Sequence, residues 1–343
     1  MSRPSRVTPR GTGTRSEAGT SGVPDGYAMV MATGIVSIAA EDQHYPALGL
    51  PLGVLASAVF TLVTVTAVGL LRRDRSARSL GQPERVLRWF SLTAACAVLA
   101  VRWRTYPTPV AYALSGAAAA AWAGLAVAAL VTLCSRSITQ LREHARGTWL
   151  LSSVACQSLA ITAADLARRH QMRPLLHLAL ACWLLGLLSY LALTMLIMAR
   201  AVTERRLPVA PDAWILMGAL AIATLAATTI TAAGRAPRPD WTATLTQPVA
   251  ALLWTLASVW VPVLVAAQAR SVFRALWRHS ARWAAVFPLG MYSTATSSLA
   301  SQRHLTALRC IALASFWIAF TACAVATVAG VRRSSGKLHR VTI

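Results

Sequence analysis

Charged side chains are scarce in this sequence, and acidic ones are the scarcest. Only 13% of the 343 residues are charged, whereas 56% are hydrophobic. A soluble domain must cover its surface with polar groups, so this composition argues against an ordinary soluble fold. It favours an all-α, polytopic integral membrane protein.

Motifs for metal, cofactor and catalytic sites are also missing. The six cysteines and seven histidines show no ligand spacing, which predicts neither a disulfide framework nor a metal site. The sequence contains no H-E-x-x-H zinc motif, no G-x-S-x-G nucleophile motif and no G-x-x-x-x-G-K-S/T phosphate loop. We therefore expect no catalytic residue, cofactor or metal, and neither an enzyme nor an ATP-driven pump.

The net charge of +22 comes from 33 Lys and Arg residues against 11 Asp and Glu residues. In a soluble protein such an excess would suggest a nucleic-acid partner. Here the basic residues lie almost wholly between apolar segments, and no basic face carries interleaved aromatic residues. We therefore expect no binding to nucleic acid, and the charge is explained by membrane topology.

Apolar segments recur along the chain at the length needed to cross a bilayer, which is about 20 residues for roughly 30 Å of hydrocarbon. In order they cover residues 27–40, 51–71, 89–101, 109–134, 149–167, 175–199, 213–233, 248–268, 283–300 and 308–331. Short polar breaks separate them, and no long polar insertion interrupts the series. The pattern predicts ten transmembrane helices arranged as five helical hairpins.

Domain organisation and orientation follow from these segments. Residues 1–26 are polar and predict a disordered tail, residues 27–331 form one membrane domain, and residues 332–343 form a basic tail. Most Arg and Lys residues lie in the tails and in the loops after the even-numbered segments, so the positive-inside rule places both termini in the cytoplasm. The lipid bilayer that surrounds the domain is expected to be the cytoplasmic membrane.

The odd-numbered segments are rich in small and hydroxyl-bearing residues, as in "SSVACQSLAITAA" and "FPLGMYSTATSSLA". Small residues allow helices to pack closely, and hydroxyls bond to backbone carbonyls or line a wet path. Two interpretations therefore remain: close packing alone, or a central pore lined by the odd-numbered helices.

Ionisable residues within or beside the apolar segments are candidates for proton or substrate sites, because a charge in hydrocarbon is costly. Glu41 and Asp42 follow the first segment, and Asp165 lies near the end of the fifth. The alternative is that all three are solvated helix ends. Arg102 and Arg104 follow the third segment and either attract anions to an outer mouth or extend to the interface.

The ninth segment, "RWAAVFPLGMYSTATSSLA", contains features that a purely structural helix does not need. Pro288 removes a helix hydrogen bond and bends the helix, and Gly290 allows a neighbour to approach closely. Phe287 lies at this bend. An apolar ring facing a pore would block ions by dewetting, whereas a ring facing lipid or protein would only pack.

Four motifs carry a resemblance to a known family: "YAMVMATGIVSIA", "GTWLLSSVACQSLAITAA", "PDAWILMGALAIATLA" and "RWAAVFPLGMYSTAT". In this order they resemble the tellurite-resistance/dicarboxylate transporter family, which includes plant slow anion channels and fungal malate and sulfite transporters. The resemblance implies five hairpins around a quasi-fivefold axis, a homotrimer and a gating phenylalanine that falls on Phe287. It makes Thr33, Gly34, Gly218 and Thr224 candidate pore-lining residues.

The sequence thus predicts transport of small anions, either inorganic anions or C4-dicarboxylates, through a central pore closed by Phe287. One alternative is a proton-coupled carrier or exporter of dicarboxylate, sulfite or a related metabolite, which would need a titratable group reachable from the pore. Another is a tellurite-resistance factor that acts without transport.

Overall fold

The computed structural model describes residues 14–73, 83–104, 106, 109–204, 211–235, 240–268 and 279–339. All regular secondary structure in these ranges is helical, which confirms the predicted all-α class. The long helices are α1 (Thr14–Asp42), α2 (Pro46–Arg73), α3 (Pro83–Arg102), α4 (Pro109–Cys134), α6 (Leu151–His170), α7 (Arg173–Thr203), α8 (Trp214–Gly234), α9 (Trp241–Gln268), α11 (His279–Arg303) and α12 (Thr306–His339). The short elements are α5 (Ile138–His144) and the 3-10 turns η2 (Gly147–Leu150) and η3 (Pro211–Ala213).

Each predicted apolar segment falls on one of these long helices, but several helices extend further than hydropathy indicates. α1 begins at Thr14 and α12 ends at His339, so both enter ranges for which the sequence predicts tails. α5 is not predicted at all; it starts at a capping box between Ser137 and Gln140. Polar residues end an apolar window without breaking helical hydrogen bonds, so hydropathy underestimates helix length.

Eight of the described helices are long and apolar enough to cross a membrane. The two long helices that are not among them are α3 and α11. α3 has charged residues in its first two turns, and α11 has many Ser and Thr residues. Both are surrounded by other helices, so they do not need a lipid-compatible surface. Hydropathy thus supports eight of the ten predicted spans, and the exact number of crossings stays a prediction.

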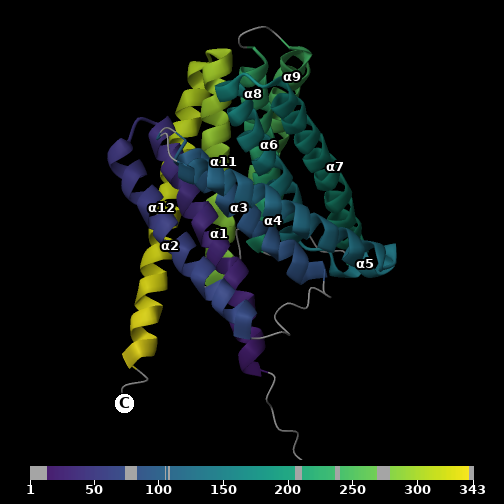
Figure 1. Cartoon of the computed structure of the whole chain (residues 1–343), viewed down its shortest axis with the longest axis vertical. Coiled ribbons are helices and arrows are strands. Elements are labelled where there is room, and N and C mark those ends of the chain that lie inside the picture. The colour runs from purple at the N-terminus through teal and green to yellow at the C-terminus, as the bar shows by residue number, and fades with distance from the viewer. Residues whose placement is uncertain are drawn as a thin grey trace, which may run out of the picture.

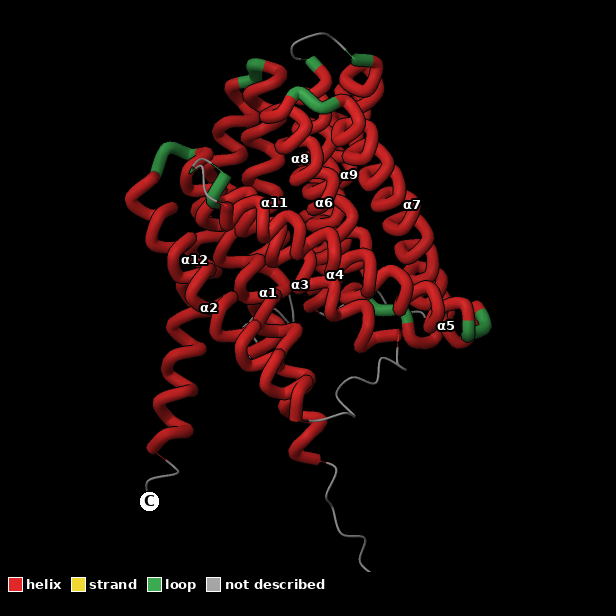
Figure 2. The backbone as a smooth tube through the Cα atoms, in the orientation of Figure 1, coloured by secondary structure: helices red, strands yellow, loops and turns green. Residues whose placement is uncertain are grey.

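Five helical hairpins form a bundle with an inner and an outer layer (Figures 1 and 2). The first helices of the hairpins contact one another in a closed ring, in the order α1, α3, α6, α8, α11 and back to α1. The second helices, α2, α4, α7, α9 and α12, each pack against the inner helix of their own hairpin. Burial separates the layers: 72–83% of the most apolar window is buried in α1, α6 and α8, against 11–28% in the outer helices.

Three of the hairpins close through the same type of cap, although none of the cap residues is glycine. His44, Gln171 and His304 have positive φ angles of 62°, 52° and 55°. In each case the next N–H donates to the carbonyl of an alanine five residues earlier in the inner helix, at 2.8–3.2 Å. This left-handed cap satisfies a carbonyl at the helix end and reverses the chain. These turns lie at one end of the bundle, and the chain enters α1 and leaves α12 at the other (Figure 1).

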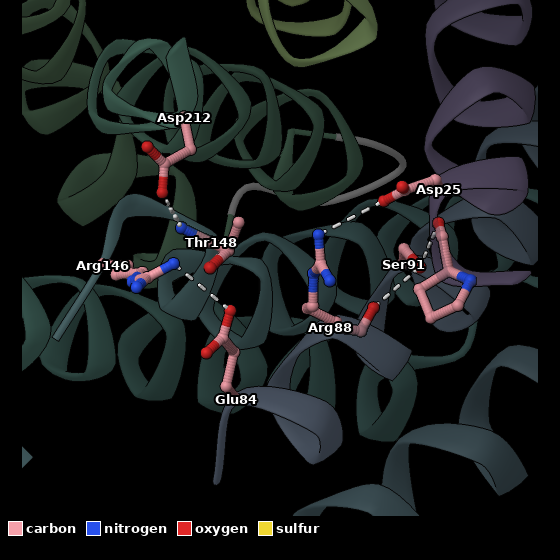
Figure 3. Close-up of polar contacts among 8 residues, drawn as sticks. Asp25, Glu84, Arg88, Ser91, Arg146, Thr148 and Asp212 are labelled. Atoms are coloured by element: carbon pink, nitrogen blue, oxygen red, sulfur yellow. Dashed lines mark hydrogen bonds and ion pairs between the residues drawn. The ribbon is translucent and has the colours of Figure 1, made fainter. Parts of the chain in front are cut away.

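At the end opposite these turns, polar contacts connect the first four hairpins (Figure 3). Asp25 of α1 pairs with Arg88 of α3 at 3.4 Å, and Glu84 of α3 pairs with Arg146, which precedes η2, at 3.7 Å. The N–H of Thr148 in η2 donates to the carboxylate of Asp212 in η3 at 3.2 Å. These contacts hold together the starts of the inner helices, which all run in the same direction.

Candidate functional site

A cavity of about 470 Å³ lies inside the ring, and all five inner helices contribute to its wall. Its lining residues are Ile35, Ile38, Glu41, Asp42 and His44 from the first hairpin; Ala97, Val98, Val101 and Arg104 from the second; Ser158 and Ile161 from α6; Ile222, Leu225 and Thr229 from α8; and Met291, Thr294, Ser297, Ser298 and Ser301 from α11. The predicted central path is therefore formed in part by an open space on the axis of the five hairpins.

The cavity changes in polarity along its depth. Because the inner helices are parallel, higher residue numbers within each helix lie closer to the turns. Ile35, Ile222 and Met291 lie at the deep end, together with the hydroxyl of Ser158. Asp42 and Arg104 lie at the mouth, beside the hairpin turns. A solute entering from the turn side therefore meets the charged groups first and a mostly apolar floor last.

Phe287 lies directly beyond this floor. Residues 287, 291, 294, 298 and 301 follow the spacing of one helix face, and the last four line the cavity. Phe287 is only 4% exposed and is not part of the lining, and Met291, one helical turn further along the same face of α11, is the first residue of this helix that lines the cavity. The gate role of Phe287 stays a prediction.

Around Pro288, α11 makes unusually close contacts with two neighbouring helices. A Cβ atom added to Gly218 of α8 would lie 2.9 Å from Cβ of Pro288, and one added to Gly290 would lie 2.8 Å from Cγ2 of Ile35 in α1. Both distances are shorter than ordinary van der Waals contact. α11 is therefore fixed between α8 and α1 at the level of Phe287.

We predict that Gly218→Ala lowers the stability of the protein by about 1–3 kcal/mol, because the new methyl group would overlap the Pro288 ring and force α8 and α11 apart. Gly69→Ala in α2 is the matched control, since a Cβ there meets no atom within 4 Å. Thermal unfolding of the detergent-solubilised protein measures the effect. Equal melting temperatures for the two variants would contradict the close packing described above.

The four candidate pore-lining residues lie at helix contacts, outside the cavity lining. The Thr33 hydroxyl donates to the Met29 carbonyl at 2.9 Å, and a Cβ on Gly34 would lie 2.7 Å from Cγ1 of Val98. Gly218 packs on the proline of α11, as described above, and the Thr224 hydroxyl donates to the carbonyl one turn earlier in α8. Sequence motifs identified the inner helices but not the face of each helix that turns to the axis.

The hydroxyls that line the cavity are mostly committed to other donor interactions. Those of Ser158, Thr229, Thr294 and Ser301 donate to backbone carbonyls of their own helix, and that of Ser298 donates to Thr228 Oγ1. Because their O–H groups are already donated, these hydroxyls present only lone pairs to the cavity, and lone pairs do not bind anions. Among the described lining residues, Ser297 is the hydroxyl without a hydrogen-bond partner. Its O–H is available to an anion.

Arg102 is buried in protein and does not extend to the interface. Its side chain is 0% exposed, its Nη2 lies 2.6 Å from Oε1 of Glu41, and its Nε donates to the Ser37 hydroxyl at 2.6 Å. A Cβ on Gly53 would lie 2.7 Å from this Nε, so the glycine makes room for the guanidinium. Nη1 and Nη2 are both buried and make no hydrogen bond, so Nη2 meets Glu41 as an ion pair only. The arginine therefore holds Glu41 against the cavity wall from behind.

Asp165 lies outside the central cavity, where its carboxylate is surrounded by three arginines. Its carboxylate lies 2.7 Å from Arg169, 3.5 Å from Arg168 and 3.6 Å from Arg104, and its side chain is buried. It lines a smaller pocket of about 70 Å³ between α3, α4 and α6. Three guanidinium groups exceed one carboxylate in charge, so the cluster around Asp165 is positive overall.

Asp42 differs from the other two acids. It lines the cavity and is half-buried, and within the described ranges its carboxylate has no hydrogen bond and no ion pair within 4 Å. The charges of Arg104 and Glu41 act on it from a greater distance. The sequence places Glu41, Asp42 and Asp165 in one class, and the structure separates them by their partners.

The described residues contain no group of three or more His, Cys, Asp or Glu side chains arranged to hold a metal ion.

Residues 23–331 match the SLAC1 family, which is described as voltage-dependent anion channel. The match covers most of the chain and includes every inner helix of the ring, so the chain belongs to this family. Members of the family transport anions across membranes, and the protein is accordingly a multi-pass membrane transporter of this class.

Two curated relatives come from two strains of Mycobacterium tuberculosis, and both are named as uncharacterized membrane proteins. Each is 30% identical to this chain over 156 residues, which is 44% of this chain and 79% of the relative. They support membrane location and add no substrate.

Proposed function

We propose that this protein conducts small anions along the axis of its five-helix ring, and that the ring of Phe287 closes the path. The observation that supports this most strongly is the position of the cavity. All five inner helices line it, and Met291, its first lining residue on α11, lies one helical turn from Phe287 on the same face of that helix. A narrow apolar segment at that point would exclude ions by dewetting, without any opposing charge.

The positive cluster around Asp165 favours anions over cations, whereas the charges of the lining itself cancel when Asp42 is counted. Arg104 lines the cavity and belongs to a cluster in which three arginines surround Asp165, and Glu41 is neutralised by Arg102. The free O–H of Ser297 supplies a donor deeper inside. The volume of about 470 Å³ is more than ten times the ~30 Å³ that one water molecule occupies in the liquid, so an inorganic anion or a C4-dicarboxylate fits with part of its hydration shell.

The predicted setting of this pore is the cytoplasmic membrane, with both termini in the cytoplasm. The arrangement of the chain supports an even number of crossings, since α1 begins and α12 ends at the same end of the bundle (Figure 1). The mouth beside the hairpin turns would then face outward. The homotrimer implied by the resemblance, the preferred anion and a contribution to tellurite resistance stay predictions.

A coupled carrier is the second candidate function, and one observation favours it. A carrier driven by protons needs a titratable group reachable from the cavity, and Asp42 meets that requirement. Asp165 does not, because it lies in the side pocket among arginines.

Ion conduction through purified protein in planar bilayers tests the proposal. Wild type and Phe287→Ala are compared in chloride, nitrate and malate gradients, and the reversal potential gives the anion selectivity. Thr294→Trp combined with Phe287→Ala provides the control, because an indole at a lining position fills the cavity and should suppress the current. Absence of current from wild type and Phe287→Ala with all three anions would contradict anion conduction.

A further inference from the structure

The charges that line the cavity balance only while both of its carboxylates are ionised. Glu41, Asp42 and Arg104 face the cavity, and Arg102 lies directly behind Glu41. The contributions of α6, α8 and α11 to the lining are uncharged. With two acids and two arginines, the site carries no net charge of its own, and an entering anion would make it negative.

Of the two cavity carboxylates, Asp42 is the one that can accept a proton at low cost. Glu41 is fixed by a 2.6 Å contact with a fully buried guanidinium, and protonating it would leave that cation without its counter-charge. Asp42 has no hydrogen bond or ion pair within the described ranges, so its protonation breaks no contact. The other titratable group in the lining is His44, at the turn.

Asp42 also competes with a soluble anion for Arg104. The guanidinium of Arg104 acts electrostatically on Asp42, while its own ion-pair partner, Asp165, is shared with Arg168 and Arg169. A neutral Asp42 would leave Arg104 free to attract an anion. Its carboxylic O–H would add a hydrogen-bond donor at the mouth.

We propose that Asp42 is the proton-binding group of the cavity, so that one proton and one small anion occupy the site together. The inference rests on the proposed role of the cavity as an anion path. Linkage makes the effect reciprocal: protonation strengthens anion binding by the same factor by which the anion strengthens proton binding. We expect a factor of about tenfold, within the range typical of coupled sites.

Two measurements on the full-length protein test this inference separately from transport. In the first, sodium nitrate is added to detergent-solubilised protein in weakly buffered solution near pH 7, and a pH indicator follows proton uptake. Wild type should take up protons on nitrate addition, and Asp42→Asn should not. In the second, nitrate flux into liposomes at clamped voltage is measured between pH 5 and pH 8, at nitrate concentrations low enough that flux follows occupancy of the site. Under these conditions the wild-type flux should gain about tenfold at the acid end.

His44→Gln is the matched control. Gln171 occupies the equivalent left-handed cap position in the third hairpin, so glutamine is compatible with the backbone of this turn. This variant should keep both the nitrate-linked proton uptake and the pH dependence of the flux. Asp42→Asn should show a flux at pH 8 close to the wild-type flux at pH 5, with little further change.

The outcomes separate the two proposals. Proton uptake that persists in Asp42→Asn, or that is lost in His44→Gln, overturns the assignment of Asp42. A wild-type protein without nitrate-linked proton uptake overturns it as well, whether or not nitrate crosses the membrane. Proton uptake without any flux, even from Phe287→Ala, would instead retain the binding site and contradict the proposed conduction.

Discussion

Replacing Phe287 with alanine should raise anion flux by about tenfold or more, which corresponds to at least ~1.4 kcal/mol removed from the barrier. Phe287 is buried one helical turn before Met291, and Met291, Thr294, Ser298 and Ser301 of the same helix face line the cavity. Removing it would join the cavity to the opposite side and allow water to fill the gap. Current in planar bilayers or flux into liposomes measures the change.

Phe316→Ala provides the matched control for this gate prediction. Phe316 is a fully buried phenylalanine of α12, an outer helix, and it stacks on Tyr45 at 5.7 Å between ring centroids. Both alanine variants lose a buried ring and about 3–5 kcal/mol of stability, so both should melt earlier. Only Phe287→Ala should gain flux. A similar gain in both variants would show general loosening of the bundle, and an unchanged flux in a folded Phe287→Ala protein would contradict the gate.

The Glu41–Arg102 pair gives the largest stability effect we expect from a single charge change. Glu41→Gln should destabilise the protein by about 3–5 kcal/mol, because it leaves a fully buried guanidinium without a counter-charge. Arg102→Met should cost less, because the remaining Glu41 side chain is 37% exposed and can be hydrated from the cavity. Combining the two substitutions should recover most of the stability lost in Glu41→Gln.

Thermal unfolding of the detergent-solubilised variants measures this asymmetry. Glu204→Gln is the control: the pair of Glu204 with Arg200 has a similar distance, 2.7 Å, but its side chains are 48% and 29% exposed. Exposed pairs contribute less than about 1 kcal/mol, so this variant should unfold close to wild type. If Glu41→Gln lowers the melting temperature no more than Glu204→Gln does, the ion pair between Arg102 and Glu41 does not contribute as described.

The sequence is less informative about residues than about segments. Its hydroxyl-rich odd-numbered segments correctly identified the inner layer, yet Thr33 and Thr224 are buried outside the cavity lining, with hydroxyls bonded to carbonyls of their own helices. Three of the four lining hydroxyls of α11, those of Thr294, Ser297 and Ser298, lie within the stretch "RWAAVFPLGMYSTATSSLA", and Ser301 follows it directly. A composition applies to a whole helix, whereas lining depends on the rotation of that helix about its own axis.

The repeated hairpin cap illustrates a signal that was present but not recognised. Three turns share the order of an alanine, three polar residues, a left-handed residue and an apolar residue, as in "AEDQHY", "ARRHQM" and "ASQRHL". Glycine is the usual residue at such a position, so its absence concealed the motif.

By itself the sequence determined the membrane class, the positions of the long helices, their pairing into hairpins and the order of the layers. The class and the helix positions follow from hydropathy and chain length, which act locally along the chain, and the order of the layers was implied by the family resemblance. Only the tertiary structure decided that Arg102 neutralises Glu41, that three arginines surround Asp165 and that Asp42 is left facing the cavity. Partners from different helices, such as Glu41 and Arg102, come into contact only when the five inner helices pack into the ring. These ion pairs determine which charged groups stay unpaired and can interact with an anion.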